Sequence, residues 1–162
     1  MAGKVLVLLG SKSDGEVMGE AARVLSEFGI PYSMTVTSAH RSPDRTRKIV
    51  RRAEEDGFSI IIAGAGCAAH LAGCVAADTL LPVIGVPLAN SPFGGFDALL
   101  STVQMPAGIP VATMAVGSAG ARNAGYLAAQ ILGLSDPALR ERIQESRLRM
   151  AKEVADSAEE IR

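Results

Sequence analysis

The chain is poor in the residues that build disulfide bonds, metal sites and strongly charged surfaces. Its 162 residues include two cysteines and two histidines, and the formal net charge is -1. No His and Cys cluster has the spacing of metal ligands, so we expect no metal site. The near balance of charge argues against a nucleic-acid partner, because such binding needs a basic surface.

Both cysteines are predicted to be free thiols. Cys67 and Cys74 are seven residues apart in what we interpret as a helix start. This spacing separates the two backbones by about 10 Å along a helix, which is too far for a disulfide bond. The N-terminus lacks the charged and then apolar segments of a signal peptide, so we predict a reducing, cytoplasmic location.

Charged residues are scarce in the middle of the chain. Between residues 57 and 121 only Asp78 and Asp97 are charged. Glycine and proline interrupt this stretch, and no window keeps about 18 uninterrupted apolar residues, so we predict no membrane span. We expect a sheet buried on both faces and uncharged helices hidden against other subunits. The mean hydropathy of +0.25 also favours an oligomer, because a small monomer exposes much surface.

Apolar runs alternate with helical patterns along the chain. Strands are predicted at residues 4–9, 31–37, 58–63, 82–86 and 110–116. Helices are predicted from a capping box at 13–16 to 28, from 42 to 56, from the turn after 63 to 79, and at 96–103, 119–132 and 135–161. Such alternation is typical of a parallel sheet with right-handed crossovers, so the sequence predicts one α/β domain.

The last predicted helix is long and mostly charged. It begins at Ser135 or Asp136 and ends near residue 161. Its thin apolar stripe consists of Leu139, Ile143, Met150, Val154 and Ile161. We expect this helix to pack on a neighbouring chain, and a solvated tail is the alternative.

Three polar motifs directly follow the first three predicted strands. They are Gly10-Ser-Lys-Ser-Asp14, Ser38-Ala-His-Arg41 and Gly64-Ala-Gly-Cys-Ala-Ala-His70, and they hold both histidines of the chain. The carboxyl ends of parallel strands lie along one edge of a sheet, so these loops can converge on one crevice. We predict that this crevice is the functional site.

The first motif favours a phosphate ligand. It combines a tight turn, the hydroxyl groups of Ser11 and Ser13, the cation of Lys12 and free amides at a helix N-terminus. The spacing matches neither a Walker loop nor a dinucleotide fingerprint, which favours a small phosphorylated ligand over ATP or NAD. An ordinary capped turn with a solvated lysine explains the same residues.

The other two motifs place histidines beside groups that can meet a ligand. Arg41 precedes a predicted helix, and its guanidinium and that helix N-terminus can share one phosphate. His40 would then stand next to the ligand, where an imidazole can transfer protons. His70 follows glycines whose missing side chains let a ligand approach the backbone. The structural alternatives are an exposed arginine, a buried histidine bonded to backbone groups, and a histidine on a helix surface.

Five strings carry a resemblance to a known family. They are GSKSD (10–14), SAHRSPD (38–44), AGAGCAAHLAG (63–73), VQMPAGIPVATMAV (103–116) and NAGYLAAQIL (123–132). Together they resemble the N5-carboxyaminoimidazole ribonucleotide mutase family of purine biosynthesis, also called the catalytic subunit of phosphoribosylaminoimidazole carboxylase. The resemblance implies a flavodoxin-like three-layer α/β/α domain at residues 1–133, with strand order 2-1-3-4-5. It further implies an octamer with sites between subunits, to which residues 134–162 would add a helical extension.

The resemblance also implies roles for particular residues. His40 would be the general acid/base, and His70 would be a second catalytic histidine that marks the bacterial mutase branch. The residues implied to bind the ribonucleotide are Ser11, Ser13, Asp14, Ser38, Arg41, Gly64, Ala65 and Gly66. The family usually has glycine, proline and lysine where this chain has Cys67, Ala72 and Ser118.

The implied reaction moves a carboxylate from an exocyclic nitrogen to ring carbon C4, and it requires neither a metal nor an organic cofactor. Decarboxylation in a closed pocket would trap carbon dioxide beside an enamine carbon, and His40 would remove the C4 proton after recombination. Two alternatives remain open. One is direct carboxylation of aminoimidazole ribonucleotide by carbon dioxide, a branch with an asparagine-containing string in place of the one with His70. The other is a nucleotide-binding module without catalytic activity.

Overall fold

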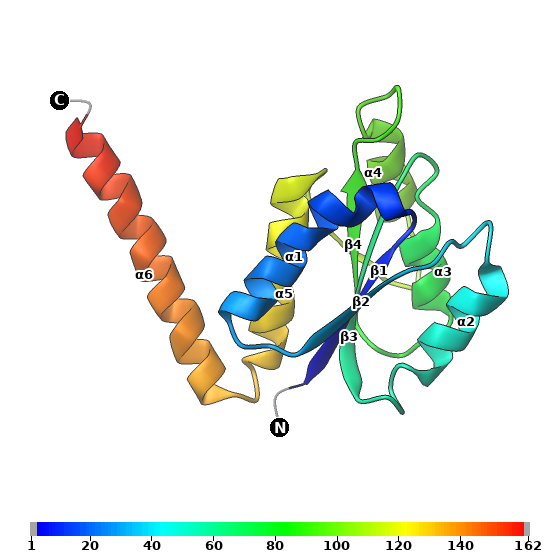
Figure 1. Ribbon diagram of the computed structural model, residues 1–162, viewed down its shortest axis with the longest axis horizontal. Helices are drawn as coiled ribbons and strands as arrows, with labels where there is room; N and C mark the ends of the chain where they lie inside the picture. The colour runs from blue at the N-terminus through cyan, green and yellow to red at the C-terminus, as the bar shows by residue number, and fades with distance from the viewer. Residues whose placement is uncertain (1–2, 161–162) are drawn as a thin grey trace.

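Five parallel strands form one sheet between two layers of helices (Figure 1). The computed structural model describes residues 3–160. Its strands are β1 (Lys4–Leu9), β2 (Tyr32–Val36), β3 (Phe58–Gly66), β4 (Val83–Leu88) and β5 (Ala112–Thr113). The order is β2-β1-β3-β4-β5, with every pair of neighbours parallel. The predicted α/β class and strand order are therefore confirmed.

The helices cover both faces of the sheet. They are η1 (Lys12–Asp14), α1 (Gly15–Glu27), α2 (Pro43–Arg52), α3 (Leu71–Ala77), α4 (Phe96–Val103), α5 (Ser118–Leu132) and α6 (Pro137–Glu160). Helices α1 and α5 pack on one face, and α2 and α3 pack on the other (Figure 1). Within residues 3–160, no helix is both long and apolar enough to cross a membrane.

Strand β1 shows why the central strands read as continuous apolar runs. Val5, Val7 and Leu9 face the core under α1 and α5. Leu6 and Leu8 face the core under α2 and α3. Because both faces of a parallel sheet are covered by helices, successive residues are all buried.

Several element boundaries differ from those predicted. The capping box lies at Ser11 and Asp14 instead of Ser13 and Glu16, because the chain first makes the short helix η1 before α1 begins. Helix α2 ends at Arg52, and a turn occupies the residues before β3.

The predicted ends of β2, β3, β4 and β5 were also wrong, and the differences are largest at β3 and β5. Strand β3 continues to Gly66 because its last residues pair with Pro87 and Leu88 of β4. Strand β5 contains only Ala112 and Thr113, since only these residues pair with β4 at that edge.

The other edge strand, β2, does not bury the apolar residues that predicted it. Tyr32, Met34 and Val36 alternate as expected, but each is more than a third exposed. The register pairs them with Val5, Val7 and Leu9, so they lie on the face of the sheet that α1 and α5 cover, yet at this edge they stay partly exposed in a single chain. The alternation therefore predicted the strand correctly without predicting what covers it.

Helix α6 leaves the domain after its first turns (Figure 1). Its start is capped by Asp136, whose carboxylate accepts a hydrogen bond from the amide of Leu139 at 3.0 Å. Leu139 and Ile143 are buried against α5 and the core, whereas Met150 and Val154 are exposed. The predicted end of this helix at residue 161 lies outside the described residues.

Helices α1 and α5 approach closely at Gly125, and this contact provides a test of the packing. A Cβ atom at Gly125 would lie 2.8 Å from Cβ of Val24 and 3.0 Å from the carbonyl oxygen of Ala21. We expect Gly125→Ala to destabilise the fold by about 1–3 kcal/mol, because the helices must separate. Thermal unfolding at fixed protein concentration measures the effect.

Gly19 of α1 is the matched control for this prediction. A Cβ atom there would meet nothing within 4 Å. We expect Gly19→Ala to stabilise the fold by about 0.5–1 kcal/mol, because alanine favours a helix over glycine. Equal effects of the two substitutions would contradict the close packing at Gly125.

Candidate functional site

The loops after the first four strands meet in one pocket of about 300 Å³. The loop after β1 contributes Gly10, Ser11 and Asp14, and the loop after β2 contributes residues 38–41. The end of β3 and the following turn contribute Ala65, Gly66, Cys67, Ala69, His70 and Leu71. Asn90, which follows β4, completes the lining. The three motifs therefore converge as predicted, and a fourth loop joins them.

Two residues predicted for the site lie behind it. Ser13 does not line the pocket, and its hydroxyl lies 3.0 Å from the hydroxyl of Ser11. Gly64 is also absent from the lining. Its Cα faces the core, where a side chain would overlap Met18. Its carbonyl accepts a hydrogen bond from the amide of Gly10 at 3.0 Å, which ties the first loop to β3. Gly64 thus serves core packing, contrary to the predicted role in ligand approach.

Asp14 is a nearly buried carboxylate with a donor on each oxygen. Its side chain accepts from the amide of Ser11 and from the side-chain amide of Asn90, each at 2.9 Å. Burial raises the pKa of Asp14 above its ordinary value of 3.8, while the bonds from Ser11 and Asn90 and the charge of Arg41 act to lower it. The carboxylate is held in place although its charged form is partly desolvated.

Hydrogen bonds within residues 38–42 hold the loop that carries His40 and Arg41. The Ser42 hydroxyl accepts from the amide of Ser38 at 3.0 Å and donates to the Ser38 carbonyl at 3.2 Å. The Ser38 hydroxyl in turn accepts from the amide of Arg41 at 3.1 Å. These bonds set the loop immediately before the N-terminus of α2.

A buried pair of threonines supports this loop from below. The hydroxyl oxygens of Thr37 and Thr46 are 2.7 Å apart, and Thr46 donates to the carbonyl of Ser42 at 3.1 Å. Both threonines are almost inaccessible to solvent. The end of β2 is thereby fastened to the first turn of α2, and no sequence motif indicated this contact.

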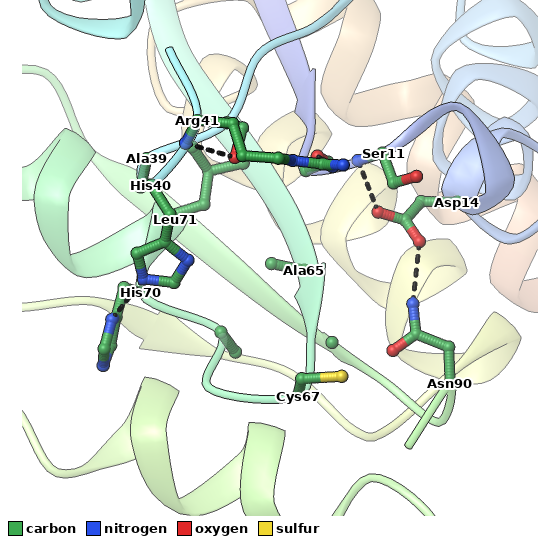
Figure 2. A pocket seen from close by; sticks show the side chains of 14 residues that line it. Ser11, Asp14, Ala39, His40, Arg41, Ala65, Cys67, His70, Leu71 and Asn90 are labelled. Atoms are coloured by element: carbon green, nitrogen blue, oxygen red, sulfur yellow. Dashed lines mark hydrogen bonds between the residues drawn. The ribbon is translucent and has the colours of Figure 1, made fainter. Parts of the chain in front are cut away.

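Arg41 links the first two loops. Its side chain extends across the pocket toward Ser11 in Figure 2. Its guanidinium donates to the carbonyl of Gly10 at 3.4 Å. The side chain is exposed, so the cation is available to an anionic ligand.

The two histidines contact each other directly. Nε2 of His40 lies 2.6 Å from Nδ1 of His70, and the rings meet edge to face at 4.8 Å. One of these nitrogens must carry the proton and the other must accept it. The pair lies on the opposite side of the pocket from Asp14 and Asn90 in Figure 2. His70 is therefore a partner of His40, and it stands immediately before α3.

The turn that carries His70 has an uncommon backbone. Cys67 and Ala69 both have positive φ, at 53° and 37°. This left-handed conformation suits glycine, the residue that the resemblance implies at position 67. Cys67 lies in this turn before α3, not in a helix as predicted. Cys67 and Cys74 are both free and exposed.

The pocket offers a definite set of chemical groups. It combines a guanidinium, hydroxyl groups, a carboxylate and two imidazoles, beside the amides at the start of α2. Cations and helix N-termini bind phosphates, carboxylates bind hydroxyl groups, and imidazoles transfer protons. Nowhere in residues 3–160 do three or more His, Cys, Asp or Glu side chains gather as a metal site would require. The arrangement suits a phosphorylated, hydroxyl-bearing ligand and proton transfer.

Comparison with known proteins identifies the family of this chain. Residues 4–153 match the AIR carboxylase family. N5-carboxyaminoimidazole ribonucleotide mutase of Thermotoga maritima is 51% identical over 158 residues, which cover 98% of this chain and 91% of that protein. The Escherichia coli K12 protein of the same name is 47% identical over 154 residues, covering 95% and 91% respectively.

A solved structure gives the same result for the fold. The crystal structure of Treponema denticola PurE superimposes with a TM-score of 0.89 at 27% identity, covering 98% of each chain. The named relatives and the solved structure all cover nearly all of this chain. The chain belongs to the AIR carboxylase family.

Proposed function

We propose that this protein is an N5-carboxyaminoimidazole ribonucleotide mutase of purine biosynthesis, an isomerase that moves a carboxylate from the exocyclic nitrogen to ring carbon C4. The observation that carries the proposal is the paired His40 and His70 in a pocket shared with Arg41 and Asp14. Relatives about half identical to this chain are named for that reaction.

The ribonucleotide would bind with its phosphate near Arg41. The guanidinium and the amides at the start of α2 supply positive charge, and the hydroxyls of Ser11 and Ser38 supply further hydrogen bonds. Asp14 would accept hydrogen bonds from the ribose hydroxyls. Ala65 and Gly66, which line the pocket, would lie against the base. Ser13 and Gly64 act indirectly, by holding Ser11 and Gly10 in place.

The reaction would proceed through trapped carbon dioxide. Cleavage of the nitrogen–carboxylate bond releases carbon dioxide, and His40 supplies the proton that the nitrogen takes up. The electron-rich C4 then attacks the trapped carbon dioxide, and His40 recovers a proton from C4, so no net proton is consumed. Because Nε2 of His40 faces His70, we assign the transfer to Nδ1 of His40. Retention of both fragments replaces a bimolecular encounter by an effectively unimolecular step.

The fate of a labelled carboxylate tests the mutase proposal. Substrate labelled in the carboxylate should give product that keeps most of the label in excess unlabelled bicarbonate, without added ATP or metal. The reason is that carbon dioxide stays in the pocket between the two steps. Mass spectrometry of the product measures retention. Complete loss of label with efficient use of free carbon dioxide would instead identify a direct carboxylase.

Substitutions should separate proton transfer from substrate binding. His40→Asn should lower kcat by at least about 10²-fold with little change in binding, because shape is kept and proton transfer is lost. Arg41→Leu should mainly raise KM, because a charged phosphate contact is lost. Steady-state kinetics with binding measurements distinguish the two outcomes. Near-normal turnover of His40→Asn would remove that residue from the mechanism.

We also propose that the chain works as a homo-oligomer, with an octamer as the expected form. Several large apolar side chains are exposed in one chain, among them Leu80 at 98%, Phe93 at 73% and Phe96 at 63%. Exposed apolar surface of this kind marks interaction sites in soluble proteins. Residues 1–133 would form the catalytic domain, and residues 134–162 would extend it for assembly. A cytoplasmic location, suggested by the free thiols, completes the proposal.

A truncation of α6 tests its role in assembly. Removal of residues 148–162 deletes the exposed Leu148, Met150 and Val154 but keeps the buried Leu139 and Ile143. We expect the truncated chain to stay folded and to assemble from fewer subunits, counted by light scattering from the mass of the assembly divided by the mass of the truncated chain, because these exposed side chains pack on a neighbour. The full chain with Lys152→Ala is the control and should keep its mass. An unchanged number of subunits after truncation would show that this part of α6 is a solvated tail.

A further inference from the structure

Asn90 connects the fourth loop to the first loop of the pocket. It lies just after β4, outside the motifs that predicted the site. Its side-chain amide donates to Oδ1 of Asp14 at 2.9 Å, although the two residues are 76 positions apart. Figure 2 shows the two side chains pointing at each other across the end of the sheet.

The other side of the Asn90 amide is fitted against β3. A Cβ atom at Gly66 would overlap the Asn90 side chain, beginning with its Oδ1 atom. Gly66 therefore leaves the space that this amide occupies. With Gly66 on one side and Asp14 on the other, the amide is confined to one position.

Asn90 and Ser11 together determine which acceptor positions of the Asp14 carboxylate are open to a ligand. Each donates to a different oxygen of the carboxylate, Ser11 to Oδ2 and Asn90 to Oδ1. A carboxylate has about four acceptor positions, so these two bonds leave acceptor capacity for a ligand. Open acceptor positions on a fixed carboxylate suit hydroxyl groups, such as those of a ribose.

We propose that Asn90 is a positioning residue for the substrate: it fixes the Asp14 carboxylate so that this group accepts hydrogen bonds from the ribose hydroxyls. This inference rests on the proposed function. Asn90 acts through Asp14, on the side of the pocket away from His40 and His70 in Figure 2. Its loss should therefore affect KM much more than kcat.

The charge on Asp14 makes the role of Asn90 measurable as a pH dependence. Burial raises the pKa of Asp14, and the Asn90 amide opposes that shift by stabilising the charged form. The charged group that acts on Asp14 is Arg41, and the other titratable groups lining the pocket are His40, His70 and Cys67. The ratio of variant to wild-type KM at each pH isolates the contribution of Asn90 from theirs.

Asn90→Asp is the sharpest variant, because it keeps the shape and removes the donor. Two carboxylates at hydrogen-bond distance repel when both are ionised and share a proton when one is protonated. We expect KM to rise about ten- to hundredfold over wild type near pH 8, and by a smaller factor near pH 6. We expect kcat to stay within about threefold. Asn90→Ala tests the same bond without repulsion and should raise KM throughout this pH range.

Ser91→Ala is the matched control on the same loop. The Ser91 hydroxyl donates to the carboxylate of Asp97 at 2.7 Å, but Ser91 does not line the pocket. This variant removes a bond between a side chain of the loop and a carboxylate, while leaving Asp14 untouched. It should keep the wild-type KM at every pH.

The outcomes separate this inference from the proposed function. A wild-type KM for both Asn90 variants, or an equal rise in KM for Ser91→Ala, would overturn the positioning role. A KM ratio for Asn90→Asp that does not increase with pH would also overturn it. If the wild-type protein itself does not convert the ribonucleotide, the proposed function fails first. With a substrate analogue that lacks one ribose hydroxyl, the KM values of Asn90→Ala and wild type should differ less than they do with the natural substrate.

Discussion

The rest of the site depends on one constraint, the parallel pairing of neighbouring strands. Strand β1 pairs with β2 and β3, and β3 pairs with β4. This pairing directs four consecutive strand ends to the same edge of the sheet, so segments up to 76 residues apart in sequence can bond. The central strands are almost entirely apolar because helices cover both faces of the sheet. The chemistry is carried by loops, but their positions are set by the sheet.

Each pocket loop is bonded to another one. The first loop is held to β3 by Gly10 and Gly64, and to the second loop by Arg41. The second and third loops meet at the two histidines, and the first and fourth meet at Asp14 and Asn90. In the described part of the chain no fully buried side-chain polar atom lacks a hydrogen-bond partner. Such a network allows the functional groups to be ordered before a ligand binds.

The sequence predicts this arrangement unevenly, for physical reasons. His40 and Arg41 could be found because they follow a strand pattern and have reactive side chains, whereas the role of Asp14 was indicated only by the family resemblance. Asn90 could not be found, since an uncharged residue in a loop rich in glycine and proline has no pattern of its own. Gly64 and Gly66 were recognisable as positions without side chains. Only the structure shows that Met18 and the Asn90 amide occupy the space.

Assembly with a neighbouring subunit would serve both the proposed chemistry and the exposed apolar surface. His40, Arg41 and His70 are exposed in a single chain, and a pocket open to water cannot retain carbon dioxide between two steps. Phe93 and Phe96 are also exposed, and they lie within six residues of Asn90 on the fourth loop. A neighbouring subunit that buries these aromatic rings would come to the edge of the pocket. Assembly would then cover the apolar surface and close the site in one step, which links the oligomer to the mechanism.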